Sequence, residues 1–238
     1  MEYIPSHSFF RFGPVPDFCQ CDSFPPMNNP DQDWELFGKT DPYFAVLTAP
    51  EYKGSLSDDA RARFFESGER HVETIIGIIR DRLDPSFAPK RALDFGCGVG
   101  RLLLPLAVRC EHVTGVDIST SMLAEARRNC EAAGATNVRL LPSDDDLSAV
   151  TGLFDFVHSY IVLQHIPVTR GERVVKRLAS LLAPGGVGMF QMSYTSGLKS
   201  WTRLRYWARR QSILAPAILM SARYAHHRVW ITALCRHP

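Results

Sequence analysis

The chain has 238 residues, of which 45% are hydrophobic and 22% charged, so it is long enough to bury a sizeable core as one domain with extensions or at most two small domains. This composition is that of a globular protein and excludes a wholly disordered chain. The formal net charge is +2, but residues 1–60 carry ten acids and three bases, whereas residues 193–238 carry eight bases and no acid. The C-terminal segment is therefore expected either to meet an acidic partner or to lie against the acidic arm of its own chain.

The six cysteines form no recognisable metal or disulfide pattern. Cys19 and Cys21 make a lone C-x-C without a second pair, so no metal site is expected. Several of the others have apolar neighbours that are typical of core thiols, which fits a reducing, cytoplasmic compartment. No signal peptide is evident at the N-terminus, and the apolar run 213–220 is too short to span a bilayer.

The N-terminal part is expected to form a loose arm followed by an aromatic cap. Residues 1–30 are rich in Pro, Asn, Ser and Phe and have no periodicity. The aromatic segment 34–47 should form short helical turns broken at Gly38 and Pro42. Its candidates to close a binding site are Trp34 and Tyr43, of which Tyr43 is the expected substrate contact.

A long amphipathic helix should begin after Ser57, because Ser is a favoured N-cap and two acids follow it. Apolar residues recur every three or four positions, and the helix should end before Pro85. Gly68 in its interior costs about 1 kcal/mol relative to Ala, which indicates a close approach by a neighbouring element or a ligand. His71 is expected to be a surface or packing residue rather than a catalyst.

The chain is organised around residues 92–101, Ala-Leu-Asp-Phe-Gly-Cys-Gly-Val-Gly-Arg. A short apolar run ends in an acid, glycines follow at alternate positions, and Leu102 starts an apolar helical stretch. This pattern predicts a strand, a tight turn and a helix, in which the glycines allow sharp turns and close approach of a ligand. The helix N-terminus favours negative charge and Asp94 favours positive charge, so the site suits a ligand with both a carboxylate and an ammonium group.

The D-x-G-x-G-x-G pattern resembles the first motif of class I S-adenosylmethionine-dependent methyltransferases. A dinucleotide-binding turn would have its third glycine at position 101, where this chain has Arg101. The resemblance implies an α/β fold with a Rossmann-like, doubly wound and mostly parallel sheet, and S-adenosylmethionine as cofactor. The cofactor-binding residues that it implies in this stretch are Asp94, Gly96, Cys97, Gly98, Gly100 and Arg101.

Two further strands should each be followed by cofactor contacts. The strand 112–117 ends in Asp117, whose carboxylate can accept both ribose hydroxyls. Ile118 would pack on the adenine, and Met122 is either a core residue or an adenine contact. The strand 137–141 is followed by three acids, of which either Asp144 or Asp145 is expected to accept from the adenine amino group, with Asp146 capping the next turn.

The segment Phe154 to Pro167 resembles the fourth strand of small-molecule methyltransferases, through its F-D-x-V start and Q-H-I end. Ligands bind at the carboxyl ends of strands in open α/β sheets, so Ser159 and Tyr160 are expected to contact the cofactor. Gln164 is the expected substrate contact. His165 is the candidate general base, with a structural role at a helix start as the alternative, because an imidazole titrates near neutral pH.

A helix over 170–182 and a fifth strand over 187–192 complete the cofactor-binding core, which we place at residues 57–192. The N-terminal arm and the aromatic cap, residues 1–56, precede this core. The family usually adds an antiparallel hairpin, whereas residues 193–238 contain a basic, aromatic helical stretch (198–210) and one clear strand candidate (229–234). We therefore expect a shortened or atypical C-terminal end of the sheet.

The resemblance implies in-line methyl transfer to a small-molecule acceptor, with a hydroxyl as the favoured acceptor. One alternative is a catalytically weak cofactor-binding partner protein, which the altered C-terminus would suit. Another is a nucleic-acid methyltransferase that uses the basic tail, although that tail could equally contact an anionic membrane surface. The acceptor itself and the oligomeric state do not follow from these patterns.

Overall fold

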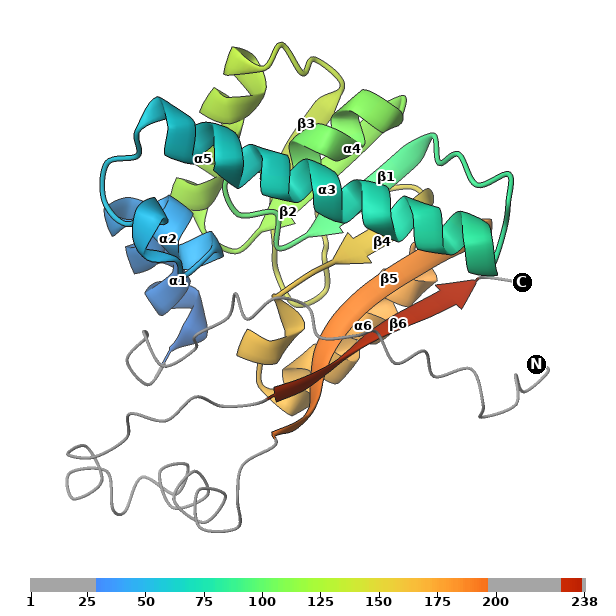
Figure 1. The fold of residues 1–238 in the computed structure, drawn as a ribbon. Coiled ribbons are helices and arrows are strands. Elements are labelled where there is room, and N and C mark those ends of the chain that lie inside the picture. Colours follow the sequence, from blue (N-terminus) through green and yellow to red (C-terminus); the bar gives the residue numbers. More distant parts are fainter. Residues whose placement is uncertain (1–28, 197–227, 237–238) are drawn as a thin grey trace.

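The computed structural model describes residues 29–196 and 228–236, and Figure 1 shows how their elements are arranged. The elements that precede the sheet are α1 (Pro30–Thr40), α2 (Pro42–Val46), the 3-10 helix η2 (Pro50–Tyr52) and α3 (Asp58–Arg82). The first half of the sheet contains β1 (Arg91–Phe95), α4 (Leu103–Arg109), β2 (His112–Asp117), α5 (Thr120–Ala132) and β3 (Val138–Pro142). The second half contains β4 (Phe154–Ser159), η3 (Leu163–His165), α6 (Val168–Ser180), β5 (Leu182–Ser196) and β6 (Arg228–Arg236).

The strands form one six-stranded sheet in the order β3-β2-β1-β4-β5-β6. Strands β1 to β5 are parallel to their neighbours, and β6 pairs with β5 in the antiparallel direction. This confirms the predicted Rossmann-like, mostly parallel sheet and the strand expected at 229–234. The basic helix expected at 198–210 and the arm before residue 29 lie outside the described residues.

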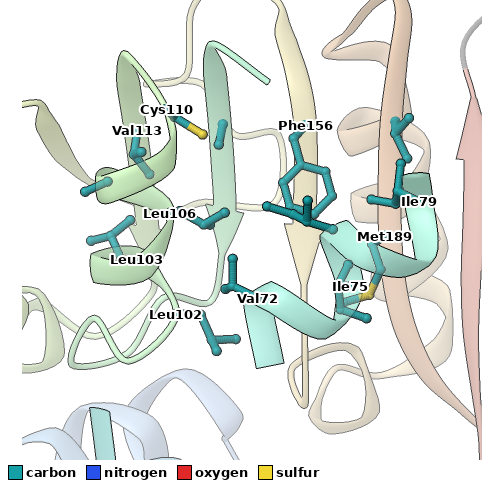
Figure 2. Close-up of a cluster of buried hydrophobic side chains, with 14 of the residues drawn as sticks. Val72, Ile75, Ile79, Leu102, Leu103, Leu106, Cys110, Val113, Phe156 and Met189 are labelled. Carbon is teal, nitrogen blue, oxygen red and sulfur yellow. The ribbon is translucent and has the colours of Figure 1, made fainter. Parts of the chain in front are cut away.

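One face of the sheet packs against α3 and α4, as Figure 2 shows. Ala92 of β1 and Phe156 of β4 point to this face, because side chains alternate along a strand. Val72 and Ile79 supply the apolar stripe of α3, and Phe156 is 1% exposed among them. Residues two positions further along each strand point to the same face, which places Asp94 and His158 beneath α3.

The opposite face is covered by α6. Leu93 of β1 and Val157 of β4 are fully buried there against Val174 and Leu178 of α6. A third apolar cluster joins α2 and η2 to α3 around the fully buried Phe64. A cleft lies at the carboxyl ends of the central strands, next to α1 and α2, which is where ligands bind in open α/β sheets.

The helix after Ser57 forms as predicted, and the Ser57 hydroxyl accepts the N–H of Ala60 at 3.2 Å. One local prediction was wrong. Helix α1 runs through Gly38 instead of breaking there, and the lack of a side chain at Gly38 lets the helix pack against Ser119. Helix α4 starts at Leu103, so Pro105 lies in its first turn, where a backbone N–H would have no acceptor within the helix.

Candidate active site

A cleft opens at the carboxyl ends of β1, β2 and β4, and its outer wall comes from α1 and α6. The sequence-predicted residues that line it are Asp94, Gly96, Cys97, Gly98, Arg101, Asp117, Ile118, Met122, Asp144, Asp145, Tyr160 and His165. Within the described part of the chain, four other predicted residues are not among its lining: Tyr43, Gly100, Ser159 and Gln164. The sheet therefore brings together most of the predicted site from four separate loops.

The glycine turn after β1 has the backbone conformation that its sequence predicts. Gly96, Gly98 and Gly100 have φ values of +75°, +52° and +91°, in the region that favours glycine. A Cβ on Gly96 would overlap the side chain of Val162, and one on Gly98 would lie 2.8 Å from Val46. The lack of side chains at Gly96 and Gly98 thus keeps the floor of the cleft open. Gly100 does not line the cleft, and its positive φ is needed for the turn.

Asp117 at the end of β2 is bound to that turn. Its Oδ2 accepts the N–H of Gly98 at 2.8 Å, and its Oδ1 accepts the N–H of Ser119 at 2.9 Å. Burial raises the pKa of Asp117 to about 6 despite these hydrogen bonds, and the charge of Asp94 adds to the rise. The carboxylate is thus mostly ionised at pH 7 and remains a strong acceptor at the cleft.

The cleft also holds a buried anion and a buried cation. Asp94 is 2% exposed and Arg101 is 5% exposed. Burial lowers the pKa of Arg101 to about 10, which leaves it cationic at neutral pH. Its Nη1 donates to Ser67 Oγ at 3.2 Å, whereas its Nε is buried without a hydrogen-bond partner among the described residues. An unpaired buried donor of this kind is costly unless a ligand accepts from it.

The turn after β3 is capped by a different acid from the predicted one. Asp144, rather than Asp146, caps the turn, since its Oδ1 accepts the N–H groups of Asp146 at 3.1 Å and Ser148 at 2.8 Å. The hydrogen bond from the Ser148 hydroxyl, and after it these bonds from the main chain, lower the pKa of Asp144. Asp145 accepts a hydrogen bond from Arg170 Nε. Asp144 and Asp145 both still border the cleft.

Arg170 and Asp31 were missed by the sequence analysis, although both line the cleft. Arg170 Nη1 donates to Asp31 Oδ1 at 2.6 Å, and Nη2 donates to Asp31 Oδ2 at 3.1 Å. Through its additional bond to Asp145, Arg170 ties α1 to the loop after β3. The two residues are 139 positions apart, so no local pattern could have paired them.

His165 lies in η3 at the far end of the cleft. Its Nε2 is 3.1 Å from the amide Nε2 of Gln164, and an amide nitrogen can only donate, so that ring nitrogen carries the lone pair. The Trp34 ring meets the His165 ring edge-on, with centroids 5.1 Å apart. Trp34 thus borders the cleft where it was expected to close the site.

Nearby Ile161 has the strained φ of +63°, and its N–H donates to Gln191 Oε1 at 2.9 Å.

Tyr43 is placed away from the cleft. Its hydroxyl is 2.6 Å from Glu125 Oε1 and 3.0 Å from Asn129 Oδ1, both on α5. Burial and the Glu125 carboxylate raise the pKa of Tyr43 to about 12. These contacts give Tyr43 a packing role between α2 and α5. Ser159 is fully buried at the end of β4, behind the cleft wall.

Within residues 29–196 and 228–236, no group of three or more His, Cys, Asp or Glu side chains could hold a metal ion. No helix in these ranges combines the length and the apolar character needed to cross a bilayer. Cys97, Cys110 and Cys130 are free thiols in the interior, and burial raises the pKa of each.

This chain is similar in sequence to known methyltransferases. Residues 92–186 match a family model described as a methyltransferase domain. A ubiquinone biosynthesis O-methyltransferase of Methylocella silvestris is 34% identical over 133 residues, which cover 56% of this chain and 50% of that protein. The chloroplastic magnesium protoporphyrin IX methyltransferase of Arabidopsis thaliana is 36% identical over 115 residues, 45% of this chain and 34% of that protein. The chain thus spans half or less of the length of these curated relatives.

Among solved structures, the N-methyltransferase NodS of Bradyrhizobium japonicum WM9, in complex with S-adenosyl-L-homocysteine, has a similar fold. The alignment has a TM-score of 0.56 and covers 89% of this chain and 100% of that one. At 19% identity this similarity concerns the fold alone.

Proposed function

We propose that this chain, whose residues 92–186 match a methyltransferase domain, is a class I S-adenosylmethionine-dependent methyltransferase that transfers a methyl group from S-adenosylmethionine to a hydroxyl of a small molecule. One observation carries the proposal. The buried carboxylate of Asp94 and the buried, incompletely paired guanidinium of Arg101 line the same cleft as Asp117 at the end of β2. The names of the relatives as O-methyltransferases support oxygen as the acceptor atom.

The residues of the cleft fit this cofactor. Arg101 would bind the carboxylate of its amino acid end, since the Arg101 Nε otherwise has no acceptor among the described residues. Asp94 would bind the ammonium group, and Asp117 would accept from the ribose hydroxyls. Ile118 and Met122 would pack on the adenine, whose amino group would face the acids at 144 and 145.

The bound cofactor supplies an electrophilic methyl group on a sulfonium, so the protein has mainly to align the acceptor and keep water away. His165 is the proposed general base for a hydroxyl acceptor, because its Nε2 carries a lone pair in the cleft. Because this lone pair accepts the Gln164 amide N–H in the structure, the Gln164 amide would have to turn away before a substrate hydroxyl could transfer its proton to Nε2. Trp34 would shield this end of the cleft from solvent.

Calorimetric titration with S-adenosylhomocysteine tests the cofactor site. We expect micromolar binding by the native chain, at least a tenfold loss in Asp117→Asn, and native affinity in the exposed control Asp81→Asn. Absence of binding by the folded native chain would refute the proposal. Equal losses in both variants would show that Asp117 has no specific role.

A second experiment tests the acceptor. Matched pairs of small molecules that differ only by a hydroxyl or an amine would be incubated with S-adenosylmethionine and analysed by mass spectrometry. We expect methylation of the hydroxyl compounds, and His165→Gln should lower kcat about 100-fold or more while leaving the affinity for S-adenosylhomocysteine unchanged. Methylation of amines alone would contradict oxygen as the acceptor.

The alternative of a cofactor-binding partner protein depends on the altered C-terminus, and that of a nucleic-acid methyltransferase depends on the basic stretch 198–210, which lies outside the described residues.

A further inference from the structure

Behind Asp94 lie two histidines, His158 and His71, to which the proposed reaction assigns no role. Asp94 at the end of β1 is paired in register with His158 of β4, and both side chains point toward α3. His158 Nδ1 is 2.9 Å from Asp94 Oδ1, and His158 Nε2 is 3.2 Å from Nε2 of His71 in α3. Asp94 and His158 are 2% and 1% exposed, so water does not substitute for these contacts.

Hydrogen-bonding chemistry determines which nitrogens of His158 and His71 carry hydrogens. An ionised Asp94 can only accept, so His158 Nδ1 must carry a hydrogen. Burial lowers the pKa of His71 to about 2, and the nearby His158 and Arg101 add to the decrease. Since His71 is therefore neutral, a single N–H joins the two Nε2 atoms. The His71 ring also packs against Tyr160, with centroids 3.9 Å apart, which fixes its orientation.

This arrangement holds one oxygen of a carboxylate that borders the cleft. Fixing Oδ1 sets the plane of the carboxylate and therefore the direction of its other oxygen. A carboxylate that rotated freely would bind a cation less well, because its orientation would have to be ordered on binding. The same turn of α3 also supports Arg101, since Ser67 accepts from its guanidinium.

We infer that His158 and His71 are positioning residues, which orient the Asp94 carboxylate to bind the ammonium group of S-adenosylmethionine. This inference rests on the proposed function, because it assigns the ammonium end of the same ligand to Asp94. It gives His71 a specific role through His158, in place of the simple packing role expected from the sequence. His71 makes no contact with the reacting atoms in this scheme.

The test compares two ligands by calorimetry. S-Adenosylhomocysteine carries the ammonium group, whereas 5′-methylthioadenosine lacks the whole amino acid end. We expect His158→Leu and His71→Leu to weaken S-adenosylhomocysteine binding about tenfold or more and methylthioadenosine binding less than threefold. His158→Asn should restore most of the affinity, because its amide N–H can replace Nδ1–H. The exposed histidine variant His112→Leu serves as the control, with both affinities unchanged.

Equal losses for both ligands in folded variants would overturn the inference, since a merely structural role would affect the whole cleft. If the native chain binds methylthioadenosine and S-adenosylhomocysteine equally tightly, Asp94 does not bind the ammonium group and the inference also fails, while the cofactor site itself stands. Nitrogen-15 NMR of the native chain gives a readout that needs no variant. We expect His158 to carry its proton on Nδ1, and a proton on Nε2 alone would overturn the inference.

Discussion

The main chain of Gly68, in the middle of α3, lies directly against the carbonyl oxygen of Arg101, so that a Cβ at Gly68 would overlap that oxygen. This contact brings α3 close enough for Ser67 to reach Arg101 in the cleft and for His71, one helical turn further along, to reach His158 behind it. The interior glycine of α3, which the sequence marked as costly for a helix, is therefore what allows the helix to support the site.

Gly68→Ala should lower the free energy of unfolding by about 2 kcal/mol, because overpacking against a main-chain atom outweighs the gain in helix propensity. Gly77→Ala is the matched control in the same helix, since a Cβ there meets nothing within 4 Å. That variant should be more stable than the native chain by about 0.5–1 kcal/mol. Urea denaturation measures both. Stabilisation in both variants would show that α3 can move away from Arg101 without cost.

Gly96→Ala should destabilise the chain by about 3 kcal/mol and abolish S-adenosylhomocysteine binding. Its φ of +75° disfavours a side chain, and the new methyl group would overlap Val162 in the cleft. Gly134, with φ of +65° and open space around it, separates the two effects. Gly134→Ala should cost only about 1 kcal/mol and leave binding intact. Native affinity in folded Gly96→Ala would exclude this turn from the ligand site.

Glu35 anchors α1 to the start of α5. Its carboxylate accepts from Ser119 Oγ at 2.8 Å, Ser121 Oγ at 2.7 Å and the Ser121 N–H at 3.1 Å. These bonds, chiefly those from Ser121, lower the pKa of Glu35 to about 2. A lowered carboxyl pKa stabilises the fold above the unfolded value of 4.5, and this contribution is lost as the pH falls from 4.5 toward 2.

Glu35→Gln should therefore destabilise the chain by about 1 kcal/mol at pH 7, a modest value because Glu35 is partly exposed. It should also accelerate cleavage by trypsin after Lys39 within α1. Glu73→Gln, on the exposed face of α3, is the control. Unchanged cleavage in Glu35→Gln would mean that other contacts, such as those between Asp31 and Arg170, hold α1 in place.

His71 should make stability depend on pH in a predictable direction. Its pKa is lowered from 6.5 to about 2 in the folded chain, where His158, Arg101 and Tyr160 surround it. Below pH 6.5 His71 takes up a proton in the unfolded chain but not in the folded chain. The free energy of unfolding therefore decreases by about 1.4 kcal/mol per pH unit. Between pH 7 and pH 5 this loss amounts to about 2 kcal/mol.

The variant His71→Gln removes the titrating group and retains an N–H for His158. Its free energy of unfolding, measured in urea at pH 7 and pH 5, should fall by about 2 kcal/mol less than that of the native chain. An identical decrease in both proteins would show that His71 is protonated in the folded state.

Features that depend on the nearest residues could be predicted from the sequence. The glycine turn was predictable because only residues without a Cβ adopt its backbone conformations readily, and the start of α3 was predictable because Ser57 caps it. Asp94 and Asp117 each end an apolar run, and parallel strands bring such ends to one edge of the sheet. Most of the cofactor cleft follows from these local rules.

Tertiary structure alone decided the rest. Gly38 does not break α1, because Ser119 of a distant helix packs where its side chain would be. Tyr43 is held by Glu125, 82 positions away, and so leaves the cleft. Hydrogen bonds between Asp31 and Arg170 join residues 139 positions apart. The sequence determined the backbone turns and the residues at the strand ends, since these depend on neighbours along the chain. Which polar side chains meet depended on how the helices pack, because such contacts form only between surfaces that folding brings together.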